Sequence, residues 1–224
     1  MADAPAVAAS GAGALWQLAA IAVGAFAVGS IPFGVVVSRA FFGRDIRSAG
    51  SGNIGAANAL RTLGKAGGAA VLLLDALKGF VPAWLALSLA GRGDGVLQAA
   101  PVLAGAVAGL AALLGHCYSP WLRLRGGKGV ATHLGVLFAL WWPAGIAFVA
   151  AWAAAGLTSG YSSAGSLTAT LVAVAALWVG LGPLGFGYGA AAALVIFWRH
   201  RENIARLRAG TENPMNLVKK RTST

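Results

Sequence analysis

Residues 129–157 read GVATHLGVLFALWWPAGIAFVAAWAAAGL, and this apolar run decides the fold that we predict. Its 29 residues are more than the roughly 20 that one membrane-spanning helix needs. Trp141-Trp142-Pro143 lies near its middle. Tryptophan favours the membrane–water interface and proline disrupts a helix, so this triplet is typical of an interfacial turn. We therefore divide the run into two short spans, 129–141 and 144–157.

The composition of the whole chain agrees with a membrane protein. Hydrophobic residues make up 58% of the 224 residues, charged residues only 10%, and the mean hydropathy is +0.75. A soluble domain carries about 25% charged residues, so this balance excludes a water-exposed surface and also disorder. We predict an all-α integral membrane protein of about seven short transmembrane helices. The other apolar runs are 15–38, 67–90, 99–115, 165–181 and 184–198.

The positive charges predict the topology. Of 17 Lys and Arg residues, 15 lie in three clusters, 39–65, 123–128 and 199–221, within a net charge of +11. Lysine and arginine accumulate in cytoplasmic loops, so all three clusters belong on the cytoplasmic side. Six spans would leave the basic tail outside, whereas seven put the N-terminus outside and the C-terminus in the cytoplasm. The outer connections are then Arg92 with Asp94, Trp142-Pro143 and Gly182-Pro183.

We divide the chain into an N-terminal extension (1–14), a transmembrane domain (15–212) and a basic C-terminal tail (213–224). Cys117 is the only cysteine, which excludes an intrachain disulfide and a cysteine-based metal site. The chain has only six acidic residues, which argues against a two-carboxylate or multi-metal mechanism. We expect no metal, no cofactor and no nucleic-acid partner.

The first cytoplasmic loop is a glycine-rich turn. Its glycines fit G-x-G-x-x-G, but no buried strand precedes them, so a dinucleotide site is not supported. Glycines let backbone N–H groups approach an anion, and a helix beginning near Gly55 would add its positive end. A flexible loop with helix caps at Ser51 and Asn53 is an equal alternative. The candidate phosphate-binding residues here are Gly50, Gly52, Asn53, Gly55 and Asn58, followed by Arg61.

The second cytoplasmic loop contains Gly126-Gly127-Lys128-Gly129. It is not a P-loop, because Gly129 stands where serine or threonine is required. A lysine among glycines at a helix start still suits an anion, and the alternative is a positive anchor at the membrane surface. We interpret His116, just before this loop, as an interfacial histidine.

Polar residues also mark the last two cytoplasmic segments and one span. The segment Tyr161–Thr168 offers hydroxyls that, taken alone, indicate helix caps. His200 and Asn203 are three apart and share a helix face, while Glu202 and Arg206 could pair at i,i+4. A basic helix attracted to anionic lipid is the alternative. Within a span, Asp75 and Lys78 predict a structural ion pair under the site.

These features favour recognition of a phosphorylated or carboxylated ligand at the cytoplasmic face. An anion transporter would use the same loops, but it would also need polar residues through the outer half, where Arg92 and Asp94 stand almost alone. A structural scaffold would not need so many glycines and amides in its loops.

The chain resembles the bacterial acyl-phosphate:glycerol-3-phosphate acyltransferases of the PlsY type. The matching stretches cover about residues 27–212 in the order of the family. They are Gly29–Gly34, Gly50–Asn58 with Arg61, Leu74–Gly79, Gly115-His116, Gly126–Thr132, Ser166, and Arg199–Asn203 with Arg206, Leu207, Gly210 and Glu212. Departures are Gly160 in place of a basic residue, Ala57 in place of threonine, and Ala164 in place of a larger apolar residue.

The resemblance implies a seven-helix enzyme of the bacterial cytoplasmic (inner) membrane with its active site toward the cytoplasm. It implies transfer of a fatty acyl group from acyl phosphate to the 1-hydroxyl of glycerol 3-phosphate, giving lysophosphatidic acid and inorganic phosphate. It also implies contact with membrane lipid, and with the soluble phosphate acyltransferase that makes acyl phosphate. The family's functional positions fall on Ser51, Arg61, Lys128, Ser166, His200 and Asn203.

We expect Arg61 and Lys128 to hold phosphate charge, and His200, oriented by Asn203, to hold phosphate or move a proton. Because acyl phosphate is already an activated mixed anhydride, we expect direct transfer without an acyl-enzyme.

Overall fold

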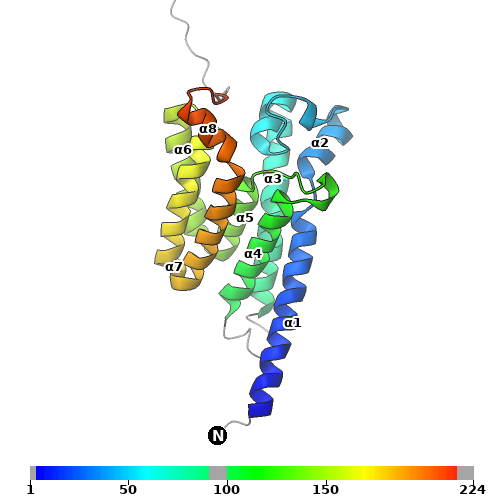
Figure 1. Cartoon of the computed structure of the whole chain (residues 1–224), viewed down its shortest axis with the longest axis vertical. Coiled ribbons are helices and arrows are strands. Elements are labelled where there is room, and N and C mark those ends of the chain that lie inside the picture. Colours follow the sequence, from blue (N-terminus) through cyan, green and yellow to red (C-terminus); the bar gives the residue numbers. More distant parts are fainter. Residues whose placement is uncertain (1–3, 91–99, 216–224) are drawn as a thin grey trace, which may run out of the picture.

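The computed structural model describes residues 4–90 and 100–215, and every regular element in these ranges is a helix (Figure 1). The predicted all-α class is therefore confirmed for the described residues. The elements are α1 (Ala4–Gly29), α2 (Phe33–Phe42), the 3-10 turn η1 (Ile46–Ser48), α3 (Ala56–Ala90), α4 (Pro101–Cys117), the 3-10 turn η3 (Pro120–Leu122), α5 (Val130–Leu140), α6 (Trp142–Ser159), α7 (Ser162–Arg199) and α8 (Arg201–Arg208).

The predicted division of the run 129–157 is confirmed. Helix α5 ends at Leu140, Trp141 is extended with φ −160° and ψ 100°, and α6 begins at Trp142. Pro143 lies in the first turn of α6, where its missing N–H has no partner to lose. One residue of extended backbone is therefore enough to separate two apolar helices.

Helix α7 folds back on itself at Gly182, just before Pro183. Gly182 has φ 61° and ψ −146°, a left-handed conformation that favours glycine. The two arms pack tightly, since a Cβ at Gly185 would lie 2.5 Å from the Leu177 carbonyl oxygen, and they lie side by side in Figure 1. The connection predicted at Gly182-Pro183 is thus present as a backbone turn.

We predict the first apolar run, 15–38, as one span, and it lies within one candidate crossing, Gly13–Phe42, but the helix is interrupted inside it. Helix α1 ends at Gly29 and α2 begins at Phe33. Pro32 cannot donate a helical hydrogen bond, which favours a break at this point. Helix α1 also begins at Ala4, inside the predicted extension 1–14.

Helix α3 begins well before the predicted run 67–90, and its backbone leaves helical geometry at Gly64, where φ is 79°. Its polar first turns therefore stand apart from the apolar stretch that follows. The predicted outer pair Arg92 and Asp94, and the basic residues Lys219, Lys220 and Arg221, lie outside the described residues.

The helix surfaces are typical of a protein surrounded by lipid. Large apolar side chains such as Leu73, Val179 and Leu194 are exposed, whereas the interior contains many alanines and glycines. Five described helical stretches are long and apolar enough to cross a membrane: Gly13–Phe42, Ala56–Ala90, Pro101–Leu122, Trp142–Ser159 and Ser162–Arg199. The chain is thus a multi-pass membrane protein, while the number of crossings and the orientation of its ends stay predictions.

Candidate active site

The second glycine-rich loop lies against the C-terminal segment. Lys128 Nζ donates a hydrogen bond of 2.6 Å to Asn203 Oδ1. Arg199 donates to the carbonyl oxygens of Gly126 at 2.7 Å and of Gly127 at 3.0 Å. Two segments that are about 75 residues apart are therefore joined by Lys128 and Asn203, which the sequence predicts as site residues. Arg199, to which the sequence analysis assigns no role, also joins them.

Glu212 connects the polar side chains of this cluster. Its carboxylate accepts hydrogen bonds from Asn203 Nδ2, from Ser163 Oγ at 3.0 Å and from Arg206 Nε at 2.7 Å. Burial alone would raise the pKa of the Glu212 carboxyl, but these hydrogen bonds hold it below its ordinary value. Glu212 is therefore a buried, ionised anchor.

The predicted pair of Glu202 and Arg206 is wrong. Glu202 is exposed and lies 3.9 Å from Arg201, because Arg206 points to Glu212 instead. A buried carboxylate that also accepts two neutral donors competes better than an exposed one for the same guanidinium.

Lys128 is half-buried, and this changes its acid–base behaviour. Burial lowers the pKa of its ammonium group to about 8, and the nearby Glu212 carboxylate opposes part of that shift. Lys128 is consequently still mostly protonated at neutral pH, yet poorly solvated. A cation in this state attracts a phosphate more strongly than a fully hydrated lysine does.

His200 is buried at the end of α7, and its Nδ1 lies 2.8 Å from the carbonyl oxygen of Ile196. A carbonyl oxygen only accepts, so Nδ1 carries the proton and Nε2 keeps its lone pair. Burial lowers the pKa of His200 to about 4, which makes the ring neutral at pH 7. The expected hydrogen bond from Asn203 to this ring is not found among the described residues, because Asn203 bonds Lys128 and Glu212 instead. The Ile196 carbonyl accepts both from the ring and from the His200 backbone N–H at 3.0 Å.

Ser166 is buried in the first turns of α7. Its hydroxyl donates to the Ser162 carbonyl at 2.8 Å and accepts from Trp152 Nε1 at 3.3 Å. The hydroxyls of this segment do not cap the helix, since no side chain caps α7 at Tyr161. Ser163 instead reaches Glu212, which brings this third segment to the cluster.

The first glycine-rich loop is organised from within by Asn58, which is buried. Its Nδ2 lies 2.8 to 3.1 Å from three loop carbonyls, those of Ile46, Ala49 and Asn53, and its Oδ1 accepts from the Ser51 N–H at 2.9 Å. A Cβ at Gly50 would lie 2.2 Å from Asn58 Oδ1. The amide of Asn58 is thus used to shape the loop.

Three candidate residues of this first loop lie where a ligand could reach them. Ser51 and Gly52 are exposed, and Asn53 accepts from the Gly55 N–H at 2.9 Å. Arg61, on the first turns of α3, is half-buried. Its guanidinium group interacts electrostatically with the Glu212 carboxylate and the Lys128 ammonium group. Hydrogen bonds therefore join the second loop to the C-terminal segment. Arg61, which follows the first loop, interacts with this cluster through its charge.

The predicted ion pair under the site is confirmed. Lys78 Nζ lies 2.7 Å from Asp75 Oδ1, both side chains are buried, and Nζ also donates to the Ile31 carbonyl at 2.7 Å. His116 Nδ1 lies 3.6 Å from the same carboxylate, and the His116 carbonyl accepts from the Gly127 N–H at 3.1 Å. His116 is therefore buried rather than interfacial, and it links the ion pair to the second loop.

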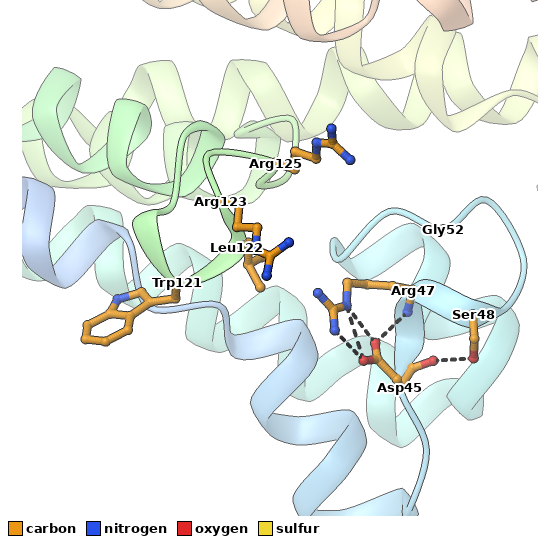
Figure 2. A pocket seen from close by; sticks show the side chains of 8 residues that line it. All are labelled: Asp45, Arg47, Ser48, Gly52, Trp121, Leu122, Arg123 and Arg125. Carbon is orange, nitrogen blue, oxygen red and sulfur yellow. Dashed lines mark hydrogen bonds and ion pairs between the residues drawn. The ribbon is translucent and has the colours of Figure 1, made fainter.

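A separate pocket of about 750 Å³ lies between the first and second loops (Figure 2). None of the six candidate catalytic residues lines it, and of the candidate phosphate-binding residues only Gly52 does. Its lining residues are Asp45, Arg47, Ser48, Gly52, Trp121, Leu122, Arg123 and Arg125.

Among the described residues no group of three or more His, Cys, Asp or Glu side chains could hold a metal ion. The site consists of Lys128, Arg61 and amide and hydroxyl groups around one buried carboxylate. Such donors can bind phosphate and stabilise negative charge that develops on oxygen.

An apolar helical bundle with this polar cluster at one end defines a class of multi-pass membrane proteins that handle anionic ligands. The family model described as glycerol-3-phosphate acyltransferase matches residues 19–210. The chain belongs to the glycerol-3-phosphate acyltransferase family.

Relatives and solved structures agree with this assignment. A glycerol-3-phosphate acyltransferase of Rhodopseudomonas palustris (strain HaA2) is 44% identical over 196 residues, covering 88% of this chain and 94% of the relative. One of Ruegeria sp. (strain TM1040) is 49% identical over 188 residues, covering 84% and 88%.

The crystal structure of PlsY (YgiH), an integral membrane glycerol 3-phosphate acyltransferase, in its glycerol 3-phosphate form is similar with a TM-score of 0.79 and 37% identity. Its lysophosphatidic acid form gives a TM-score of 0.77 and 36% identity. Both comparisons cover 88% of this chain and 94% of the other. The predicted resemblance to the PlsY family is confirmed.

Proposed function

We propose that this protein transfers a fatty acyl group from acyl phosphate to the 1-hydroxyl of glycerol 3-phosphate, giving lysophosphatidic acid and inorganic phosphate. The observation that carries the proposal is the hydrogen-bonded link from Lys128 through Asn203 to Glu212. Its relatives' names support glycerol 3-phosphate as acceptor, and one similar structure is a lysophosphatidic acid form.

Both substrates carry a phosphate, and Lys128 and Arg61 supply positive charge for them. Lys128 is held by Asn203, which a buried carboxylate fixes in turn, so the ammonium group is positioned before substrate arrives. A preorganised charge of this kind costs little reorganisation during the reaction. The Ser51 hydroxyl adds a hydrogen-bond donor, and the glycines Gly50, Gly52, Gly55, Gly126, Gly127 and Gly129 let the backbone of both loops come close to a phosphate. The N–H groups of Gly52, Gly55, Gly126 and Gly127 already donate within the protein, so the loops contribute mainly by their shape.

The reaction needs no acyl-enzyme. The substrate's hydroxyl oxygen attacks the acyl carbon, the bond from that carbon to the phosphate oxygen breaks, and phosphate leaves with the electron pair. The hydroxyl proton passes to the leaving phosphate or to Nε2 of His200, whose lone pair is free because Nδ1 is bonded to Ile196. Positioning and charge neutralisation then supply most of the rate.

We place the protein in the bacterial inner membrane with these loops toward the cytoplasm, where glycerol 3-phosphate and the soluble phosphate acyltransferase are available. The exposed apolar helix faces would lie against lipid and against the acyl chain of the donor.

The test is a donor comparison with the purified protein in detergent. Acyl phosphate, acyl-coenzyme A and acyl carrier protein thioester are each supplied with glycerol 3-phosphate, and lysophosphatidic acid and released phosphate are measured. We expect turnover only with acyl phosphate, and phosphate release that depends on glycerol 3-phosphate. Equal turnover with a thioester would contradict the proposed donor, and an acylated Ser51 or Ser166 found by mass spectrometry would contradict direct transfer.

A further inference from the structure

The pocket between the first and second loops has its own charge pattern. Arg47 contributes one wall, and Arg123 and Arg125 contribute the other. Asp45 is the only acidic residue that lines the pocket, and it already bonds Arg47 at 2.6 Å and Arg39 at 2.8 Å. Its carboxylate is therefore neutralised by these two arginines.

Arg123 and Arg125 make no ion pair within residues 4–90 and 100–215, and both are exposed. Figure 2 shows the guanidinium groups of Arg123 and Arg47 facing each other from the two loops. Like charges that share a pocket repel each other, so an anion between them would be bound favourably.

The backbone holds the second loop in this shape at a cost. Arg123 and Leu124 have φ of 52° and 62°, and they are the only residues other than glycine with positive φ in the described chain. The Leu124 N–H donates to the Ser119 carbonyl at 2.9 Å, and Arg125 N–H donates to Leu122 at 3.0 Å. A strained but hydrogen-bonded turn is often retained where its side chains have a function.

The surroundings indicate where the anion comes from. The pocket lies at the ends of two candidate spans: Trp121 and Leu122 end the span Pro101–Leu122, and Asp45 follows the span Gly13–Phe42 by three residues. Trp121 is 73% exposed while its Nε1 donates to Ser30 Oγ at 3.0 Å, and Leu124, three residues further along the chain, is 58% exposed. A tryptophan at the end of a span, with its N–H hydrogen-bonded and its ring exposed, is typical of the membrane interface.

We propose that this pocket binds the phosphate of an anionic phospholipid headgroup, as a lipid site separate from the candidate acyl-transfer site. Arg123, Arg125 and Arg47 hold the phosphate, and the acyl chains lie beside Trp121 and Leu124. A soluble phosphate would have no use for these two exposed apolar side chains.

Native mass spectrometry of the detergent-solubilised protein tests this site. Phosphatidylglycerol and phosphatidylcholine with the same acyl chains are titrated separately. We expect one phosphatidylglycerol to bind about tenfold more tightly than phosphatidylcholine. Its affinity for Arg123→Gln/Arg125→Gln should be about 25-fold weaker than for the wild type, since each basic residue near the membrane surface contributes roughly a fivefold change.

The matched control is Lys65→Gln/Arg208→Gln, which removes the same charge from two exposed residues that do not line the pocket. It should retain wild-type affinity, and Arg123→Lys/Arg125→Lys should retain most of it. Equal losses in the pocket variant and the control would overturn the site. Full displacement of the lipid by an equal concentration of inorganic phosphate would assign the pocket to a soluble anion and overturn the lipid ligand.

Discussion

Lys128 Nζ lies 2.6 Å from Asn203 Oδ1, although 75 positions separate the two residues in the chain. Asn203 Nδ2 in turn donates a hydrogen bond to the Glu212 carboxylate. The ammonium group is therefore held by an amide whose own orientation depends on a buried carboxylate.

Replacing Lys128 by alanine removes the positioned cation. We expect acyl transfer to fall by about a hundredfold or more, as for other preorganised groups that stabilise developing charge, while the protein stays folded in the membrane. Lysophosphatidic acid formation is the measurement, with Lys65→Ala as a control of equal charge on an exposed residue. Near-normal turnover in the Lys128 variant would remove it from the catalytic site.

The pKa of about 8 predicts how activity depends on pH. Above that pH the free enzyme loses the Lys128 charge, so kcat/KM for glycerol 3-phosphate should fall as pH rises through about 8. Lys128→Arg should move this fall to higher pH, because a guanidinium stays protonated. An unchanged profile in the arginine variant would mean that another group titrates.

The lowered pKa of Lys128 also determines how the free energy of unfolding changes with pH. Between about 8 and the ordinary value of 10.5, the unfolded chain binds more protons at Lys128 than the folded chain does. The free energy of unfolding from this group should therefore rise with pH across that window, and Lys128→Met should abolish the rise. Thermal unfolding in detergent at several pH values measures it.

Glu212→Gln tests the anchor of the cluster. The variant keeps the shape of the side chain but loses charged hydrogen bonds to Arg206, Asn203 and Ser163, and we expect a loss of about 2 kcal/mol in stability. Because the folded pKa is lowered, the wild-type contribution is present above the ordinary value of 4.5 and lost as pH falls below it. Glu202→Gln, on an exposed carboxylate, should change stability little.

Gly50→Ala tests whether Asn58 shapes the first loop. The added Cβ would lie 2.2 Å from Asn58 Oδ1, so the loop must move, and a shift of this size can cost about tenfold to a hundredfold in activity. Gly43→Ala is a matched control, because Gly43 has the same φ of 61° but no atom within 4 Å of the added Cβ. Similar losses in both variants would indicate backbone strain alone.

Breaking the Asp75–Lys78 pair should destabilise the bundle. Asp75→Asn leaves the Lys78 ammonium buried without its partner, which costs about 3–5 kcal/mol in comparable pairs. Asp75→Leu/Lys78→Met should recover much of this loss. If Asp75→Asn unfolds at the wild-type temperature in detergent, the pair has no structural role.

The sequence by itself determined the features that depend on local composition. Apolar length and proline position predict the division of the run 129–157 at Trp141 and the turn at Gly182, because helix length and helix breaking are properties of neighbouring residues. Asp75 and Lys78 were also predictable as a pair, because three residues of helix place them on one face.

Only the tertiary structure decided which polar groups meet. Arg206 pairs with Glu212 rather than Glu202, and His200 bonds Ile196 rather than Asn203. A Cβ at Gly29 would lie 2.2 Å from the Ala112 carbonyl oxygen on α4, a contact that no local pattern contains. Partner choice depends on which segments pack together and on which groups are buried beside them, and both are set by the whole bundle.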